Sequence, residues 1–214
     1  MAKDNYIKTK NAPLVWAFLG VNIAILLSII LSGKADLSSL NAIWKQMTIK
    51  DGLTATGLPV LAVILAGVLG DIGKARVVFW RIWNPLPGCR AFTHFVHADP
   101  RINSAALIAK LGEFPTDPRQ QNSLWYQLYK KRASAIIVTR AHKEYLLTRD
   151  LAGISAVLLC LFGVAAAISD AAFRLQLGYT LFLVLQYICS AVAARNYGNR
   201  FVTNVLVEES QDSL

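Results

Sequence analysis

The side chains of this 214-residue chain that could together bind a metal ion lie in one short stretch. His94, His97 and Asp99 form a His-x-x-His-x-Asp cluster, which offers nitrogen and oxygen ligands to an ion such as zinc. Asp99 precedes Pro100, however, and an acid before a proline is typical of a capped helix start. If residues 92–97 are extended, His94 and His97 also point to opposite faces of the strand. We therefore expect no metal site here.

No other arrangement of polar side chains predicts catalysis. The serines of the central segment lack the glycine context of a nucleophile elbow, and His142 is more typical of a packed or solvated residue than of a general base. Cys89 is expected to be a small residue in a turn rather than a reactive thiol. Cys160 and Cys189 lie in apolar segments, so no disulfide framework is indicated. The sequence predicts a protein that is not an enzyme and that needs no cofactor.

The candidate partner-binding residues lie on a helix that we expect to begin after Asp117. Trp125 and Tyr129 belong to an apolar stripe, and Lys130, Lys131 and Arg132 form a basic run. The stripe must be buried against a short preceding helix, the strand-like run 92–96 or another copy of the protein. The basic run faces solvent or lipid headgroups, or else contacts a nucleotide or nucleic acid. We assign these five residues to binding a soluble cytoplasmic protein and expect nucleic acid contact only through that partner.

Composition indicates a membrane protein, because 55% of residues are hydrophobic, 16% are charged and the mean hydropathy is +0.43. Four segments, residues 14–32, 53–72, 151–169 and 175–194, are almost free of charge. Each has about 18 to 20 residues, which is enough to cross a hydrocarbon core of roughly 30 Å as a helix. The predicted fold is an all-α membrane protein with four transmembrane helices and a helical insert between the second and third.

The basic residues predict the orientation, since positively charged loops stay in the cytoplasm. One side of the membrane would hold 18 Lys and Arg residues and the other side 4. Both termini are therefore expected in the cytoplasm, at a bacterial inner membrane. The predicted order is a tail at 1–12, a transmembrane hairpin at 13–73 with an amphipathic outer loop at 33–52, a basic helical module at 74–150, a second hairpin at 151–194 and a cytoplasmic tail at 195–214. The fourth helix is expected to continue into this tail through Arg195 and Arg200, and the acidic end of the tail is expected to be disordered.

Within the module, two Asp-Pro-Arg sequences predict two helix starts. The first predicts a helix over residues 100–111 that Gly112 ends. The second, at Asp117 with Gln120 as the third helical residue, forms a capping box. No glycine or proline follows until Gly153, so nothing in the sequence obliges this helix to stop before the third apolar segment, and an unbroken helix would reach residue 169.

Residues at the membrane segments predict contacts with lipid and with other helices. Basic and aromatic residues alternate where the second segment leaves the membrane, which is typical of the headgroup layer: Lys74, Arg76, Trp80, Arg81 and Trp83. Small residues share one face of the third segment and favour close helix packing within the bundle or in a homo-oligomer: Ala152, Ala156, Cys160, Gly163 and Ala167. Asn22 is expected to make an interhelical hydrogen bond rather than to line a transport path.

The layout resembles a known group of proteins in its size, its topology and its cytoplasmic segment, in particular residues 85–92, 99–102, 121–126 and 145–150. It is similar to the small four-helix membrane proteins of bacterial antiphage defence operons, such as the membrane subunit of the Kiwa system. The resemblance implies a homo-oligomeric membrane sensor or scaffold that works with a cytosolic protein. It assigns no functional residue in this chain.

These observations favour a non-enzymatic, oligomeric inner-membrane sensor or scaffold whose cytoplasmic module binds a soluble partner and responds to membrane disturbance. The alternative is an effector that opens a pore or disrupts the membrane and is gated by the same module. A third interpretation, an enzyme acting on lipid or sugar, requires His94, His97 and Asp99 to converge.

Overall fold

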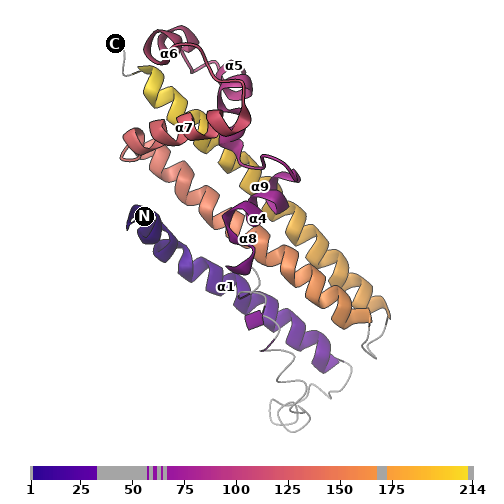
Figure 1. Cartoon of the computed structure of the whole chain (residues 1–214). Helices are drawn as coiled ribbons and strands as arrows, with labels where there is room; N and C mark the ends of the chain where they lie inside the picture. The colour runs from indigo at the N-terminus through magenta and orange to yellow at the C-terminus, as the bar shows by residue number, and fades with distance from the viewer. Residues whose placement is uncertain are drawn as a thin grey trace. The chain divides into compact units, whose positions relative to one another are not determined.

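The computed structural model describes residues 2–32, 57, 60, 61, 64, 67–167 and 173–211 (Figure 1). Every regular element within these ranges is a helix, which confirms the predicted all-α class. The predicted outer loop at 33–52 and much of the segment 53–72 lie outside the described residues. The chain divides into two units, one of residues 1–70 and 150–190 and one of residues 71–149 and 191–214.

Three helices whose bounds the structure describes contribute to the first unit: α1 (Ala2–Ser32), the later part of α8 (Ile136–Ala167) and the first part of α9 (Phe173–Gln211). Its apolar core contains one residue of α1 and two each of α8 and α9: Leu19, Ile154, Leu158, Tyr179 and Leu183. The helix α1 begins at Ala2 rather than at the apolar segment 14–32, so Pro13 lies inside it.

A small polar cluster joins α1, α8 and α9 in this unit. The Gln186 side-chain amide donates to Asn22 Oδ1 at 3.2 Å and to Ser155 Oγ at 3.4 Å. Asn22 also donates to the Phe18 carbonyl in its own helix at 2.9 Å. The prediction that Asn22 makes an interhelical hydrogen bond is therefore confirmed, with Gln186 as its partner.

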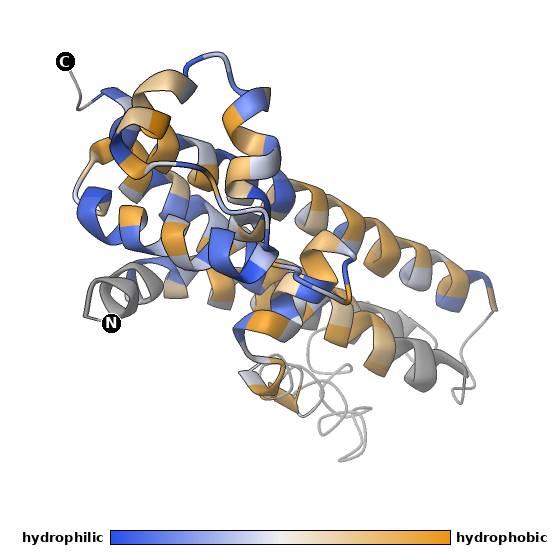
Figure 2. Cartoon of the chain, turned by 45° about the horizontal axis from the view of Figure 1, so that its top comes forward, coloured by the Kyte–Doolittle hydropathy of each residue, from blue (hydrophilic) through white to orange (hydrophobic). Residues whose placement is uncertain are grey.

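Among the described residues, α9 is the one helix that is both long and apolar enough to cross a membrane. Its first half consists mostly of hydrophobic residues (Figure 2). Several of its large apolar side chains are exposed, including Leu177, Leu181 and Leu185 at 48%, 59% and 61%. On α8, the predicted small-residue face is only partly buried, because Ala152 is buried, Ala156 half-buried and Cys160 exposed. The burial of Gly163 and Ala167 lies outside what the structure describes.

The second unit contains a set of short helices packed on the beginning of α8 and the end of α9. In chain order they are α4 (Gly70–Phe79), the 3-10 helix η1 (Pro87–Arg90), the π-helix η2 (Ala91–Phe95), α5 (Val96–Ala98), α6 (Ser104–Leu111) and α7 (Pro118–Arg132). An aromatic core joins α7, α8 and α9, with Trp125, Tyr129, Tyr145 and Phe201 all buried. The centroids of the Trp125 and Phe201 rings are 5.2 Å apart in an edge-on arrangement.

The Asp-Pro-Arg sequences predicted one helix start correctly and one wrongly. Asp117 caps α7, because its Oδ1 accepts from the backbone amides of Arg119 and Gln120 at 3.0 and 2.9 Å. The preceding helix starts at Ser104 instead of residue 100, with Asn103 as its cap. Asp99 is instead held by the Arg101 side chain at 2.7 Å. Gly112 follows the last residue of that helix, as predicted, with φ at 77°.

The helix that begins at Pro118 is not unbroken, although no glycine or proline obliges it to stop. The chain turns at residues 133–135 between α7 and α8, and the turn is closed by Ala135 N donating to the Arg132 carbonyl at 3.0 Å. The Thr139 hydroxyl donates to the Ala133 carbonyl at 2.9 Å and so replaces a lost helical bond. The turn lets the apolar stripe of α7 pack on α8 and α9. A straight helix would leave that apolar surface unburied.

Two further expectations fail in the same unit. Residues 92–97 are helical rather than extended, and the buried Gln121 side chain explains their position. Its Oε1 accepts from the backbone amides of Phe92 and Thr93, each at 3.1 Å. The C-terminal tail is not disordered up to residue 211, because α9 continues to Gln211 and residues 201–207 are buried. The tail is thus part of the module's core.

Candidate functional site

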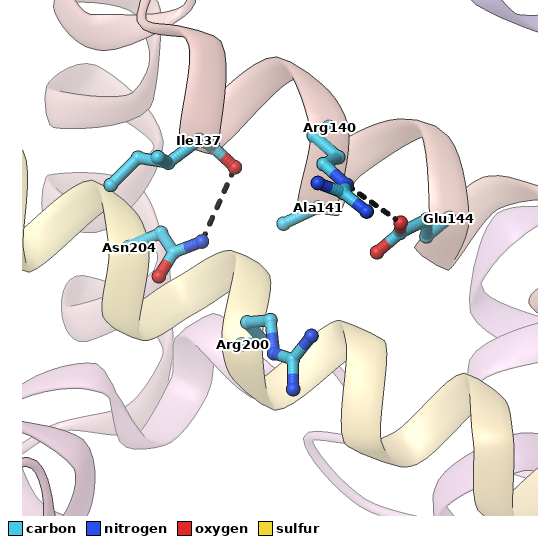
Figure 3. A pocket seen from close by; sticks show the side chains of 6 residues that line it. All are labelled: Ile137, Arg140, Ala141, Glu144, Arg200 and Asn204. Atoms are coloured by element: carbon cyan, nitrogen blue, oxygen red, sulfur yellow. Dashed lines mark hydrogen bonds and ion pairs between the residues drawn. The ribbon is translucent and has the colours of Figure 1, made fainter.

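A polar groove lies between α8 and α9 in the second unit, with a cavity volume of about 230 Å³ (Figure 3). Both helices contribute side chains to it: Ile137, Arg140, Ala141, Glu144, Arg200 and Asn204. A second depression of about 240 Å³ continues along α9 and is lined by Ala193, Asn196, Tyr197 and Arg200. Arg200 therefore borders both hollows.

Hydrogen bonds fix the groove wall. The Asn204 side-chain amide donates to the Ile137 carbonyl at 3.2 Å, which ties α9 to the first turn of α8. Asn204 Oδ1 accepts from Arg101 Nη2 at 3.4 Å. On α8, Arg140 Nε lies 3.2 Å from Glu144 Oε1 across one helical turn. These contacts satisfy Asn204, Arg140 and Glu144 within the chain.

Arg200 is the exception among the groove's charged residues. It makes no ion pair or hydrogen bond through its guanidinium within the described residues, and its nearest aromatic contact is the Tyr197 ring at 5.9 Å. Because Arg140 and Glu144 neutralise each other, the six lining residues carry one uncompensated positive charge. A guanidinium presents a planar fork of donors that matches a carboxylate. The lining contains no serine, cysteine or histidine, so its chemistry suits binding rather than nucleophilic catalysis.

The aromatic core directly supports the groove. His142, beside the lining residue Ala141, stacks on the Phe201 ring with centroids 4.6 Å apart and an interplanar angle of 6°. Its Nδ1 is 3.1 Å from the Tyr129 hydroxyl. His142 is thus a packed core residue, as expected from the sequence. This contact sets the rotation of α8 against α9 and hence which side chains line the groove.

The five predicted partner-binding residues do not form one surface. Trp125 and Tyr129 are only 7% and 8% exposed, and Trp125 Nε1 donates to the Val202 carbonyl at 3.4 Å. Arg132 is bound to Glu209, whereas Lys130 and Lys131 are exposed. The apolar stripe that suggested a partner is covered by the chain's own α8 and α9.

An ion-pair cluster that sequence reasoning missed surrounds the buried Glu209 carboxylate. Lys110 Nζ of α6 and Arg132 Nε of α7 each lie 2.6 Å from one of its two oxygens. Figure 1 shows α6 and α7 beside the C-terminal end of α9, where this carboxylate lies. Burial alone would raise the pKa of the Glu209 carboxyl, but hydrogen bonds from Lys110 and Arg132 outweigh it and hold the pKa below its ordinary value.

The predicted headgroup residues lie at the end of α4 and in the loop that follows. Trp80 and Trp83 are 55% and 82% exposed, Arg76 and Arg81 are exposed, and Lys74 is half-buried. The helix ends at Phe79, before the segment 84–88, which contains two prolines and a glycine. This set therefore remains accessible, as a lipid-facing role requires.

The histidine cluster does not form a metal centre in the described part of the chain, where no three His, Cys, Asp or Glu side chains converge. His94 and His97 are exposed, and the Asp99 carboxylate is bound by Arg101. Burial raises the pKa of the Cys89 thiol, which makes it a poor nucleophile at neutral pH.

Comparisons with known proteins find no matching family model, no matching curated protein and no matching solved structure. The sequence itself contains a signal for the polar face of the groove. Asn196, Arg200 and Asn204 are spaced four apart, so they share one face of a helix. A polar stripe of this kind in a predicted tail would have indicated an ordered helix with a polar surface.

Proposed function

We propose that the chain is an integral membrane protein with four transmembrane helices, both termini in the cytoplasm and its location in a bacterial inner membrane. The 18-to-4 bias of basic residues supports this orientation. The exposed apolar side chains on the first half of α9 support burial in lipid, because apolar surface of this extent is unfavourable in water. The hydrogen bonds among Asn22, Ser155 and Gln186 support close packing of α1, α8 and α9 within the bilayer.

The protein acts without catalysis, as a scaffold or sensor whose cytoplasmic module binds a soluble partner in the groove between α8 and α9. The observation that carries this proposal is the uncompensated Arg200 guanidinium at the meeting point of two depressions. The groove would accept a partner segment that carries a carboxylate side chain. Arg200 would bind the carboxylate, and Asn196 and Asn204 would stand on either side of it.

Two features extend the proposal to assembly and biological setting. The small residues of α8 from Ala152 to Ala167 support a homo-oligomer in the membrane, because they allow helices to approach closely. The resemblance in layout to membrane proteins of antiphage defence operons makes defence the setting to test. Phage plaque counts with and without the gene and its neighbours would answer that question directly.

The docking proposal is tested by affinity purification in mild detergent, with neighbouring genes present and captured proteins identified by mass spectrometry. The variant Arg200→Glu reverses the groove charge and should abolish capture of the soluble partner. Arg119→Glu is the matched control, since Arg119 is an exposed arginine of the same unit outside the groove. The double variant Lys130→Glu/Lys131→Glu tests the surface predicted from the sequence.

Loss of capture with Arg200→Glu and retention with the other variants would support the groove. Loss only with the double lysine variant would move the binding surface to α7. Equal capture by every variant would refute docking at both surfaces, and ion leakage from reconstituted vesicles would then indicate a pore.

A further inference from the structure

The stretch from residue 72 to 98 carries four basic residues and no acidic one: Lys74, Arg76, Arg81 and Arg90. The acids that border it are already engaged. Asp71 Oδ1 lies 3.0 Å from Arg149 Nη1, and Asp99 Oδ2 lies 2.7 Å from Arg101 Nη2. The positive charge of this stretch is therefore not balanced by its neighbours in sequence.

None of the three arginines, Arg76, Arg81 and Arg90, has an anionic partner within the described residues. Arg76 donates to a backbone carbonyl of the loop, which leaves Arg81 and Arg90 as the candidates for binding an anion. The Arg90 Nε atom is buried and makes no hydrogen bond, and the guanidinium carbon lies 5.8 Å from the Phe79 ring centroid and 5.9 Å from that of Phe95. Burial lowers the pKa of Arg90, and the positive charge of Arg81 lowers it further. The Phe79 ring beside Arg90 belongs to a residue only two positions before Arg81, which places the two arginines in the same part of the unit. A bound anion there would reduce the repulsion between two positive charges.

The loop that presents Arg81 is fixed by the second unit itself. Trp80 has φ at 52° and Asn84 at 47°, and a positive φ is strained for a bulky residue such as tryptophan. Arg76 Nε donates to the Ile82 carbonyl at 3.1 Å. The Arg195 guanidinium of α9 covers the Trp80 ring, with its carbon 3.5 Å from the ring centroid. The strained conformation is thus held by contacts on both sides.

Directly after Arg81 in the chain, the loop exposes large apolar surface. Ile82 is 71% exposed and Trp83 is 82% exposed. Indole rings and aliphatic side chains beside guanidinium groups are typical of the layer where lipid headgroups meet acyl chains. A free inorganic anion would satisfy the arginines but would leave Ile82 and Trp83 in water. A lipid would satisfy both.

We propose that Arg81 and Arg90 bind the phosphate of an anionic phospholipid headgroup, while Ile82 and Trp83 enter the interfacial layer beside it. This proposal rests on the membrane location proposed above. It adds a defined phosphate site to the general headgroup contact predicted from the sequence, and Arg90 was not among the residues of that prediction.

The test measures binding of short-chain phosphatidylglycerol to the full-length protein in detergent micelles by calorimetry. Short-chain phosphatidylcholine and inorganic phosphate are the comparison ligands. Arg81→Gln should weaken phosphatidylglycerol binding about tenfold, as expected for loss of one charge-assisted contact. Arg119→Gln is the matched control and should leave binding unchanged. Arg90→Lys keeps the charge, loses the planar fork and should weaken binding to a similar extent.

Equal weakening by Arg81→Gln and Arg119→Gln would refute a defined site, because only the overall charge would then matter. Phosphate binding as tight as phosphatidylglycerol binding, unchanged by Trp83→Ala, would refute the lipid as ligand. Arg81 is exposed, so Arg81→Gln decides the question even if Arg90 variants fail to fold. Failure of the membrane location would be seen separately, as extraction of the wild-type protein from membranes by alkaline carbonate.

Discussion

Replacing Glu209 with glutamine tests whether one buried carboxylate holds the end of α9 to α6 and α7. The carboxylate is 1% exposed and forms an ion pair with Lys110 of α6 and another with Arg132 of α7, each with a nitrogen–oxygen distance of 2.6 Å. Glutamine keeps the size and one acceptor oxygen but removes the negative charge. The Lys110 and Arg132 side chains would then lie beside a neutral group.

The expected loss follows from the exposure of the three groups. Removing one partner of a fully buried ion pair costs about 3–5 kcal/mol. Lys110 and Arg132 are 33% and 21% exposed, so each can regain contact with water once the carboxylate is gone. We therefore discount the loss to about 2 kcal/mol. A loss of that size corresponds to about a 30-fold change in an equilibrium constant.

Hydrogen–deuterium exchange reports this change where it occurs. Amides of residues 205–211 should exchange about 30-fold faster in Glu209→Gln than in the wild type, because local opening of the helix end becomes easier. The full chain is measured in detergent micelles at neutral pH. Amides of α1 act as an internal reference, since α1 belongs to the other unit.

Glu208→Gln is the matched control, because it removes the same charge one residue away, where the side chain is half-buried and makes no ion pair within the described residues. Its exchange should stay close to that of the wild type. If the two variants differ by less than about threefold, the ion pairs contribute less than about 0.7 kcal/mol and the reasoning is refuted.

Three further predictions concern pH, packing and a buried amide. The folded pKa of Glu209 lies below its ordinary value of 4.5, so the stability that its ion pairs give the folded state is complete above that value and is lost as pH falls through the folded pKa. After correction for intrinsic exchange rates, the amides of residues 205–211 should therefore exchange faster on acidification in the wild type. In Glu209→Gln their exchange should not change with pH. Gly198→Ala should lower the midpoint of thermal unfolding, because the added Cβ would lie 2.9 Å from the Phe79 ring and 3.0 Å from the Tyr145 ring. Gly178→Ala is the control, since no atom lies within 4 Å of its added Cβ, and it should leave the midpoint unchanged. Equal midpoints for the two variants would contradict this packing. Gln121→Leu should destabilise the protein by about 2 kcal/mol in chemical denaturation, because two backbone amides lose their acceptor, and a loss below about 0.5 kcal/mol would show that water replaces it.

Local signals in the sequence predicted several features that the structure confirms. The all-helical class followed from apolar segments and from the spacing of apolar residues along the chain. Asp117 before Pro118 predicted the start of α7, because the side-chain oxygen and the missing proline amide act within a single turn. Gly112 predicted the end of α6 for the same local reason, and Asn22 predicted an interhelical hydrogen bond from its polarity in an apolar setting.

The failures have a common physical cause, which is that contacts distant in sequence outweighed local preference. Nothing in residues 133–135 requires a turn, and the turn forms because it allows the stripe of Trp125 and Tyr129 to pack against Phe201, more than 70 residues away. Residues 92–97 are helical where they meet the buried Gln121. The tail is helical because its carboxylate Glu209 is bound from α6 and α7.

The sequence by itself determined the helical class, the apolar segments, the charge bias and the local caps, because each depends on residues within a few turns of one another. Only the tertiary structure decided which residues form the groove. The sequence predicted a helix through Arg200 and a tail beyond it, but only the packing of α9 on α8 turns the polar face of Arg200 and Asn204 toward Arg140 and Glu144. The same packing buried Trp125 and Tyr129, because apolar side chains that find a surface within the chain are no longer available to a partner.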